Sequence, residues 1–554
     1  MGFEPSPYQQ AIYNEVATTD HNINVNAVAG SGKTTTLLGC LERIPRGKSI
    51  IFMAFNNSIV KELQARNRRP NVDIMTLHSY GWRLLLRRYG NAAKMNPNKS
   101  IAKLEVVLKR HSHDEAVQEL LMRRKKGYLI YLIPKIVDLM RTALCRPEIG
   151  EIEALCEYHD IDCGPLEKQL ALETFAVAAA DVSQFDFTDM LYVPVTDPSV
   201  RFRKYEVIMV DESQDMSLLQ HELIKRALDR RSRLITVGDP RQAIYGFAGA
   251  DANSYARLAE LNGTSVEMPL SVCYRCGRRI VEEAEKIVPY IRPYERAHEG
   301  EVALGSLNDI EDGDWIICRN LRPLIEVYLW LLKNKIKSQV RGKDIGRSLV
   351  DLIDKTGART VDQLDALLMK EADKLAQKLR NKGWNNPDAS PKMDELFEKI
   401  EVIRALAVEV STIAELRDTI EGIFTDELKG ILLMTIHKSK GLENDNVFFL
   451  APELIPSRFA TQPWQLEQEL NLKYVAITRA KNSLIYVPLN QKDLTSVNHS
   501  QDDIQSKAHD DELNKAEDRI EDTLEEDRIE RRQQRDVPSP RQIANVLRSE
   551  NINK

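Results

Sequence analysis

The sequence predicts an α/β protein built from two parallel sheets, each interrupted by a mainly helical insertion. Short apolar strands alternate with helical segments in two separate blocks, and this alternation is typical of parallel sheets covered by helices. The expected strands span residues 23–28, 49–54, 72–77, 205–210 and 233–237 in the first block and 314–318, 430–436, 446–450 and 483–487 in the second. At 554 residues the chain is long enough for two to four domains of roughly 150 residues each.

The two blocks and their insertions set the expected domain boundaries. We expect a first sheet domain, its insertion, a second sheet domain, its insertion and a C-terminal tail. The first sheet domain covers residues 1–83 and 187–268, with its insertion at 84–186. The second covers residues 269–350 and 425–490, with its insertion at 351–424, and the tail covers residues 491–554. The tail holds 11 Lys or Arg and 16 Asp or Glu residues and almost no aromatic residues, a composition typical of a solvated, flexible segment that could recruit a partner protein.

The composition excludes several classes of protein. Hydrophobic residues make up 43% of the chain and charged residues 29%, and no apolar run approaches the ~20 residues that a membrane span needs. The N-terminus has no basic and then apolar leader, and seven scattered cysteines do not suggest a disulfide framework. We therefore expect a cytoplasmic protein without a membrane partner, in which Cys273 and Cys276 are reduced thiols.

The negative net charge is concentrated at the C-terminal end. The tail carries −5 of the total of −6, so the rest of the chain is close to neutral. Residues 87–135 hold 12 Lys or Arg against 4 Asp or Glu, with the run Arg123–Lys126 at the peak. Such a patch is usually a solvated helix face, but it could also hold a phosphate backbone. The overall charge therefore does not exclude a nucleic acid partner.

The strongest motif is a glycine-rich stretch between an expected strand and an expected helix. Gly30 and Gly32 let backbone N–H groups close around phosphate oxygens, and the following helix N-terminus adds a partial positive charge. Lys33 can reach the β- and γ-phosphates, and the Thr34 hydroxyl can bind Mg²⁺. We therefore predict a nucleotide site formed by one contiguous run: Ala29, Gly30, Ser31, Gly32, Lys33, Thr34 and Thr35.

Two adjacent carboxylates follow another buried strand, at Asp211 and Glu212. The run Val207–Val210 is short and β-branched, as expected for a strand buried on both faces, and open α/β sheets bind ligands at the carboxyl ends of their strands. Asp211 would hold Mg²⁺, directly or through water. Glu212 would orient and deprotonate the attacking water.

These motifs and others occur in the order found in superfamily 1 helicases of the UvrD/Rep/PcrA type, which the chain resembles over about 490 residues. The matching segments begin at Pro7, Ala27, Met53, Thr76, Asp186, Val210, Val237, Cys273, Met434 and Tyr474. The resemblance implies two RecA-like domains that bind one ATP with Mg²⁺. Both insertions are short for the family, which favours a compact member, phage-encoded or close to the F-box helicases.

The resemblance also implies roles for residues outside the phosphate loop. Near the base and ribose it places Gln9, Tyr274, Gly441 and Glu443. Near the γ-phosphate it places a sensor, a contact and an arginine finger, namely Gln242, Arg275 and Arg479. In this scheme, the second sheet domain supplies Arg275, Glu443 and Arg479 across a cleft.

The same resemblance implies a track for single-stranded DNA. Tyr245 and Phe247 would offer aromatic faces to bases, and stacking of this kind tolerates any base sequence. The other implied contacts come from three motifs and are Phe55, Asn56, Thr76, His78, Thr435 and His437.

The implied activity is ATP-dependent movement on single-stranded DNA, 3′→5′, with unwinding of duplex junctions in replication, recombination or repair. Such a protein would act in a nucleoid or in a phage-infected host cell. Two alternatives stay open. The chain could be a DNA-stimulated ATPase that displaces proteins or serves as a scaffold without processive unwinding. It could also be a helicase–nuclease subunit, but this would need an acidic cluster and a lysine in a compact domain after residue 490, and the tail lacks the composition for such a core. No residue excludes RNA as the track.

Overall fold

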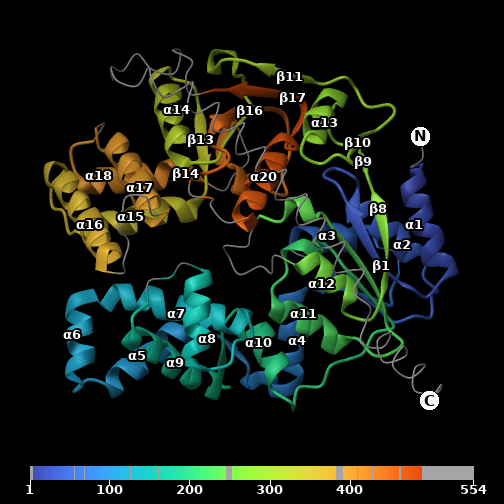
Figure 1. The fold of residues 1–554 in the computed structure, drawn as a ribbon, viewed down its shortest axis with the longest axis horizontal. Helices are drawn as coiled ribbons and strands as arrows, with labels where there is room; N and C mark the ends of the chain where they lie inside the picture. The colour runs from blue at the N-terminus through green and yellow to red at the C-terminus, as the bar shows by residue number, and fades with distance from the viewer. Residues whose placement is uncertain are drawn as a thin grey trace, which may run out of the picture. The chain divides into compact units, whose positions relative to one another are not determined.

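The computed structural model describes residues 4–54, 57–67, 69–124, 126–159, 161, 163–244, 253–381, 391–408, 410–425, 430–458, 460 and 463–488 (Figure 1). By its packing the chain divides into two compact units. The first contains the chain up to Val302 together with Ile477–Ser483, and the second contains Ala303–Ala476 and the chain from Leu484 onward. The domain boundaries expected from the sequence stay predictions.

A six-stranded sheet forms the centre of the first unit, and all its strand pairs are parallel. Its strands are, in spatial order, β3 (Val72–Thr76), β2 (Ile50–Ala54), β6 (Val207–Val210), β7 (Arg233–Gly238), β1 (Asn22–Ala27) and β8 (Ser265–Leu270). All five strands predicted for the first block are present, with ends shifted by at most a few residues. The sixth strand, β8, was not predicted; most of its side chains are not buried and it contains Pro269.

Helices cover both faces of this sheet, and alternate strand residues enter two separate cores. Ile50 and Phe52 pack in one core with helices α1 (Pro7–Thr18), α2 (Lys33–Arg43) and α3 (Asn57–Arg66). Ile51 and Met53 pack in the other, with α4 (Leu77–Tyr89), α10 (Asp189–Thr196), α11 (Leu218–Ala227) and α12 (Ser254–Glu260). Because both faces are buried, the loops at the carboxyl ends of the strands are where this sheet can present a ligand site.

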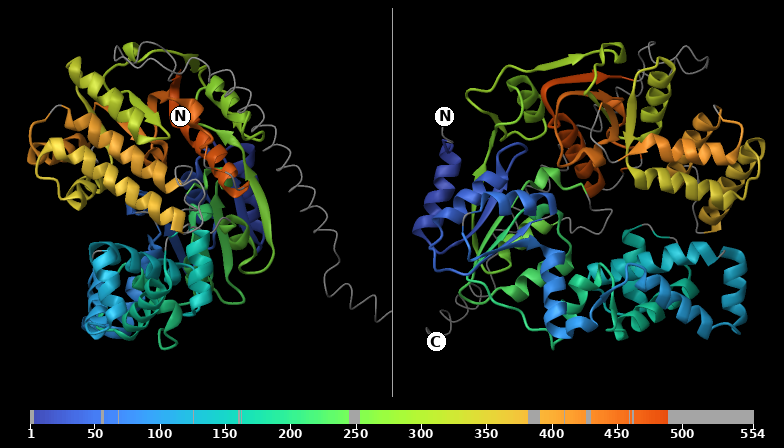
Figure 2. Two further views of the ribbon diagram at one scale, coloured as in Figure 1. Left: turned by 60° about the vertical axis from the view of Figure 1, so that its left-hand side comes forward. Right: turned by 180° about the vertical axis from the view of Figure 1, so that it is seen from behind.

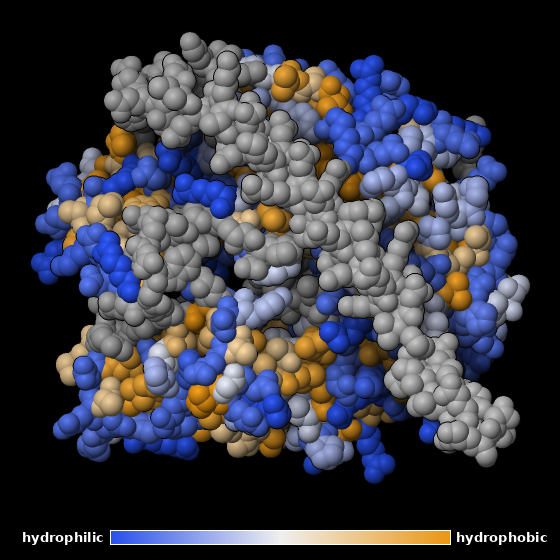
Figure 3. All heavy atoms as spheres, viewed as in Figure 1, coloured by the Kyte–Doolittle hydropathy of each residue, from blue (hydrophilic) through white to orange (hydrophobic). Residues whose placement is uncertain are grey.

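The first insertion is a helical body between α4 and α10, and it belongs to the first unit. Its helices are α5 (Lys99–Arg110), α6 (Glu115–Arg124), α7 (Lys126–Thr142), α8 (Ile149–Tyr158) and α9 (Pro165–Ala180). They share a core that includes Leu104, Val137 and Phe175. Two short parallel strands, β4 (Lys94–Met95) and β5 (Gln184–Phe185), pair where the chain enters and leaves the insertion. Hydrophobic and hydrophilic residues alternate over its visible surface (Figure 3), and scattered exposed apolar side chains such as Met122 are ordinary.

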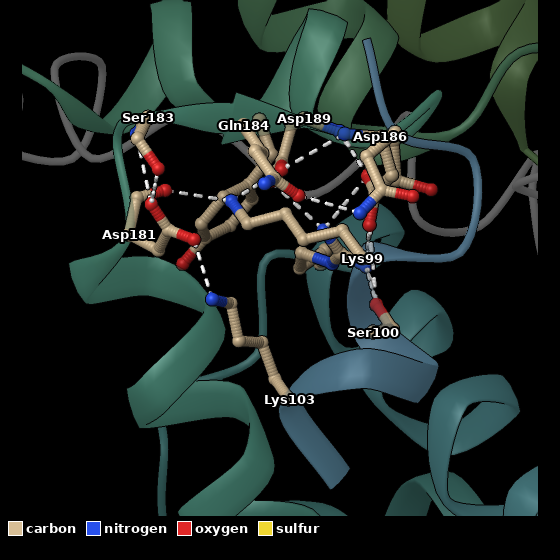
Figure 4. Close-up of polar contacts among 12 residues, drawn as sticks. Lys99, Ser100, Lys103, Asp181, Ser183, Gln184, Asp186 and Asp189 are labelled. Atoms are coloured by element: carbon tan, nitrogen blue, oxygen red, sulfur yellow. Dashed lines mark hydrogen bonds and ion pairs between the residues drawn. The ribbon is translucent and has the colours of Figure 1, made fainter. Parts of the chain in front are cut away.

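A buried ion network joins the insertion to the first residue of α10 and to the segment before it (Figure 4). We define it by four side chains: Lys99, Arg141, Asp186 and Asp189. Arg141 donates to both carboxyl oxygens of Asp186 at 3.0 and 2.9 Å and to Asp189 at 2.8 Å, and Lys99 donates to Asp189 at 2.7 Å. All four residues are no more than 5% exposed. Burial raises the pKa of the Asp189 carboxyl, although Arg141 acts against this rise.

The second sheet has seven strands and lies mainly in the second unit; residues 301–302 and 480–483, at the starts of two of its strands, belong to the first unit. Its order is β11 (Glu301–Leu304), β17 (Ala480–Val487), β16 (Asn444–Leu450), β12 (Trp315–Cys318), β15 (Ile431–Thr435), β13 (Ser338–Arg341) and β14 (Phe424–Thr425). The four strands predicted for the second block are β12, β15, β16 and β17. Its helices are α14 (Leu321–Lys333), α15 (Lys343–Thr356), α16 (Val361–Asn381), α17 (Pro391–Ala407), α18 (Ile413–Ile423), α19 (Ile436–Ser439) and α20 (Pro463–Ile477). Helices α15–α18 form the second insertion (Figure 2) and share one core with the sheet, which includes Leu324, Ile403 and Leu433.

The observed architecture confirms the predicted α/β class: two sheets of the RecA-like kind, each interrupted by helices. Among the described residues, no helix is both long enough and apolar enough to span a bilayer. The charged tail predicted after residue 490 lies outside the described residues.

Candidate functional site

The phosphate-binding loop lies where the sequence predicts it, between the end of β1 and the start of α2. Gly30 and Gly32 adopt positive φ angles of 66° and 78°, and Gly32 is the N-cap residue of α2. The Ser31 hydroxyl is buried and has no hydrogen-bond partner among the described residues. Backbone N–H groups and an unsatisfied hydroxyl therefore converge at a helix N-terminus, an arrangement that suits phosphate oxygens.

Lys33 and the carboxylate pair meet beside this loop. The Lys33 ammonium lies 3.1 Å from Oε1 and 3.2 Å from Oε2 of Glu212. Burial alone would lower the pKa of Lys33, but the carboxylates of Glu212, Asp239 and Asp211 raise it. Burial and the neighbouring Glu212 raise the pKa of Asp211 to about 7. Lys33 is thus one partner of the residue expected to act as the base.

The residues expected to hold Mg²⁺ fit that ion by their chemistry. Thr34 supplies a hydroxyl in the first turn of α2, and Asp211 supplies a buried carboxylate at the end of β6. Hard oxygen ligands of this kind are what Mg²⁺ prefers, and a cation would offset the cost of burying the Asp211 charge.

The base end of the predicted site is formed by α1 and a loop after β8. Gln9 is buried; its amide donates to the Thr36 hydroxyl at 3.0 Å and accepts from the Ser6 backbone N–H at 2.9 Å. The Gln9 amide nitrogen can donate one more hydrogen bond and the amide oxygen can accept one more, so Gln9 can still contact an adenine edge. The Tyr274 ring packs against Tyr294 at 5.0 Å between centroids.

The segment that carries Tyr274 and Arg275 packs directly on the phosphate loop. The Tyr274 backbone N–H donates to the Gly30 carbonyl at 2.9 Å. A Cβ atom added to Gly30 would lie 2.6 Å from the Arg275 Cβ and 2.9 Å from the Cys273 Sγ. Cys273 and Cys276 are free thiols, as predicted. The loop therefore needs glycine at residue 30 for two reasons, its positive φ angle and this close contact.

Both candidate arginines belong to the first unit. Arg275 donates to the Thr478 carbonyl at 3.3 Å, and the Gly277 N–H donates to the Lys481 carbonyl at 2.8 Å. Arg479 lies between these two acceptors in the sequence, is 1% exposed and donates to the Thr478 hydroxyl at 3.2 Å. Residues 275 and 479 are thus held in neighbouring segments of the unit that carries the loop.

Gln242 ends a short helix, η3 (Pro240–Gln242), that follows β7. Its amide donates to the Asp239 carboxylate at 2.8 Å, and both residues are buried. Burial raises the pKa of Asp239 to about 6, although Lys33 acts to lower it.

Thr35, the last residue of the predicted loop, accepts a hydrogen bond from Arg66 at 3.4 Å.

Four predicted site residues belong to the second unit. Thr435 is the N-cap residue of α19, and burial and the nearby Arg319 lower the pKa of His437 to about 4. Gly441 has a φ angle of 81°, and Glu443 is exposed. A neutral His437 ring can contact DNA through shape and hydrogen bonding but not through charge.

The expected DNA contacts of the first unit are only partly described. Phe55, Asn56, Tyr245 and Phe247 lie outside the described residues. Thr76 is buried, and its hydroxyl caps α4 by accepting from the Ser79 N–H at 3.1 Å.

His78 lies in the first turn of α4, half-buried, with its ring 4.5 Å from the Phe187 ring and tilted by 36°. Burial lowers the pKa of His78 to about 4, so the ring is neutral at neutral pH. Phe187 is 63% exposed. The pair therefore offers an uncharged aromatic surface to solvent.

Two family descriptions match the chain and together cover well over half of it. The UvrD/REP helicase N-terminal domain matches residues 8–261, and the UvrD-like helicase C-terminal domain matches residues 386–491. The chain belongs to the UvrD-like helicases. The first match includes the phosphate loop and the carboxylate pair, and the second includes Gly441, Glu443 and Arg479.

Curated relatives of this UvrD-like helicase are distant. F-box DNA helicase protein 1 of Schizosaccharomyces pombe is 23% identical over 520 residues, which cover 84% of this chain and 55% of the relative. The ATP-dependent DNA helicase Rep of Salmonella typhimurium is 23% identical over 608 residues, covering 83% and 88%. PcrA of Staphylococcus epidermidis is 26% identical over 294 residues, covering 50% and 39%. The chain thus spans about half the length of the F-box relative.

Two residues beside the site had no role in the sequence analysis. Phe187 stands in the segment before β6, and Gln214 follows the carboxylate pair. The sequence signal for Phe187 was present, because an aromatic residue stands between two acidic residues in a matched motif. Its exposure and its contact with His78 come from tertiary structure alone.

Replacing Gly30 with alanine should lower the free energy of unfolding more than the matched change Gly32→Ala. Both positions have positive φ, which costs a non-glycine residue roughly 1–2 kcal/mol. Only at Gly30 would the new methyl also overlap its neighbours, because the nearest atom at Gly32 is 3.7 Å away. Overpacking costs typically about 1–3 kcal/mol more. Urea denaturation measures the difference, and equal losses would show that the 273–275 segment does not pack on the loop.

Proposed function

We propose that this UvrD-like helicase hydrolyses ATP to move along single-stranded DNA, 3′→5′, and unwinds duplex DNA at junctions in replication, recombination or repair. The observation that carries the proposal is the meeting of Lys33, Asp211 and Glu212 beside the glycine loop. The polarity rests on the family resemblance alone. The relatives named DNA helicases support a DNA track.

In this proposal the chain's own residues divide the chemistry of ATP hydrolysis. The loop N–H groups and Lys33 bind the β- and γ-phosphates. Thr34 and Asp211 would hold Mg²⁺, which neutralises charge on the phosphates when bound. Glu212 accepts the proton of the attacking water, and Gln242, Arg275 and Arg479 contact the γ-phosphate and the charge that develops on it.

Because Lys33 pairs with Glu212, we expect ATP binding to change the environment of Glu212 before hydrolysis begins. Phosphate oxygens compete with the Glu212 carboxylate for the Lys33 ammonium, since a lysine ammonium lying at 3.1 Å from one carboxylate must reorient to meet another anion. Once Lys33 moves to the phosphates, its positive charge stabilises the Glu212 carboxylate less, so that carboxylate becomes the stronger base. Binding of the substrate thereby prepares the base.

The aromatic pair His78 and Phe187 is the described surface best suited to bases of a single strand. Stacking on an exposed aromatic ring tolerates any sequence, as a moving enzyme requires. We therefore add Phe187 to the DNA contacts expected from the sequence.

Replacing Phe187 with alanine should weaken single-stranded DNA binding by roughly 1–3 kcal/mol, the usual contribution of one base stacked on an aromatic ring. Phe187→Trp should keep the affinity, because it preserves the flat face. Fluorescence anisotropy with a labelled oligonucleotide measures both. Since Phe187 is largely exposed, thermal stability should not change. Unchanged affinity in the alanine variant would exclude this contact.

The first test is steady-state ATP hydrolysis with and without single-stranded DNA, with RNA as a second track. We expect DNA to increase the rate of ATP hydrolysis strongly. A rate that neither DNA nor RNA changes would overturn the proposal. Strand displacement on 3′- and 5′-tailed duplexes then tests polarity and unwinding. DNA-stimulated turnover without strand displacement would favour the alternative, an ATPase that displaces proteins or serves as a scaffold. Deletion after residue 490 tests whether the tail is needed only for a protein partner.

A further inference from the structure

The carboxylate expected to act as the base is held by a buried amide, Gln214, in the short helix η2 (Ser213–Asp215). The Gln214 Nε2 donates to Glu212 Oε2 at 2.6 Å and to Asp215 Oδ2 at 3.0 Å. Its Oε1 accepts from the Asp239 backbone N–H at 3.0 Å. A backbone N–H can only donate and carboxylates accept, so this network fixes which end of the amide faces Glu212.

Gln214 packs closely against the backbone at the end of β7. A Cβ added to Gly238, at the end of β7, would lie 2.7 Å from the Gln214 Oε1 and 2.3 Å from the Ser213 Oγ. Glu212 itself has a positive φ of 52°, which a non-glycine residue adopts only where its surroundings impose it. The end of β7 and the turn after β6 are therefore packed together around one amide.

The same amide connects two parts of the proposed active site. On one side it donates to Glu212, which also contacts Lys33 at 3.1 Å. On the other side it holds the backbone of Asp239, whose carboxylate accepts from the Gln242 amide at 2.8 Å. Gln242 is the expected sensor of the γ-phosphate. Gln214 therefore links η3 to the Glu212 carboxylate through a continuous chain of hydrogen bonds.

We propose that Gln214 is a positioning residue that orients the Glu212 carboxylate and couples it to η3, so that proton transfer depends on the state of the Gln242 side chain. This inference rests on the proposed function, in which Glu212 is the base of ATP hydrolysis. Gln214 needs no contact with the nucleotide in this role. Removing it should reduce kcat and leave ATP binding nearly unchanged.

The test uses two variants of the full chain, Gln214→Met and Gln214→Glu. Methionine keeps the length of the side chain without hydrogen bonds, and glutamate keeps the acceptor but loses both donors to the carboxylates. Each should lower kcat about 10- to 100-fold, the usual effect of losing a residue that orients a catalytic group. The affinity for a fluorescent ATP analogue should change less than about threefold, within the scatter expected for sites without contact. Gln220→Met is the matched control, because Gln220 caps α11 without touching Glu212.

A double variant separates positioning from a general loss of structure. In the Glu212→Gln background, Gln214→Met should cause no further loss in single-turnover hydrolysis, because residues acting as a unit are not additive. A kcat within threefold of wild type for both single variants, or an additive loss in the double variant, would overturn the role of Gln214. If Glu212→Gln by itself leaves turnover intact, the proposed base is wrong instead, and the two failures are distinguished.

Discussion

Glu212→Gln is expected to reduce ATP turnover by about 10²- to 10⁴-fold, the range that a general base contributes, while ATP binding becomes tighter. The substitution keeps the shape of the side chain and removes the carboxylate that accepts the proton. It also removes the anion that pairs with Lys33 at 3.1 Å, so the ammonium becomes free to bind phosphate. Single-turnover hydrolysis and titration with a fluorescent ATP analogue measure the two effects.

The opposite signs of these effects make the experiment decisive. Glu222→Gln, which removes a partly exposed carboxylate of α11 that pairs with Arg226, is the matched control and should change neither quantity. A Glu212→Gln variant that keeps more than a tenth of the wild-type rate would refute Glu212 as the base. A weaker affinity for ATP would show that the Lys33–Glu212 pair does not compete with phosphate.

Arg141→Met is expected to lower the free energy of unfolding by about 3–5 kcal/mol, the usual result of removing one partner of a buried ion pair. Arg141 donates to both Asp186 and Asp189, and its loss leaves two buried carboxylates close together, with Lys99 still paired with Asp189. Urea denaturation measures the loss. Adding Asp186→Asn to the variant should recover part of it, because the uncompensated charge is removed.

The pH dependence of this loss follows from the same charges. Burial already raises the pKa of Asp189, and removing Arg141, which acts against this rise, raises it further above its value in the unfolded chain. The destabilisation of Arg141→Met should therefore grow as the pH increases through the acidic range. Arg146→Met is the control: this exposed arginine pairs only with surface glutamates among the described residues, and its removal should leave stability nearly unchanged at every pH. A similar loss in both variants would contradict the role of the buried ion network.

Sequence periodicity was sufficient for the strands whose faces are both buried. β2 and β6 are buried at every position, and continuous apolar runs predicted them. β8 and β13 were not predicted, because SVEMPL is mostly exposed and contains proline, and SQVR contains one apolar residue. These strands exist through pairing with a neighbour, β1 for the first and β15 for the second, and such pairing leaves no periodic signal.

In the candidate site, too, local features were predictable from the sequence and long-range contacts were not. The phosphate loop is local, so a strand, two glycines and a helix start were enough to predict its geometry. Gln214 and Phe187 acquire their positions from residues distant in the sequence, Asp239 and His78, and motif spacing carried no information about those contacts. The roles predicted for Arg275, Arg479, Glu443 and the DNA contacts stay predictions.

The order of strands in the first sheet has a consequence for synthesis of the chain on the ribosome. Ile23 of β1 pairs with Ile235 of β7, and Ile50 of β2 pairs with Val207 of β6. The two central strands therefore emerge only after the whole helical insertion has been made. Helical contacts within the insertion are local and form quickly. Until β6 and β7 are made, β1 and β2 lack the strands that pair with them in the sheet, and the apolar faces of β1, β2 and β3 stay incompletely covered. We expect the nascent chain to pass through a stage in which the insertion is folded but the two central strands of the sheet, β6 and β7, are absent. Aggregation is most probable at this stage.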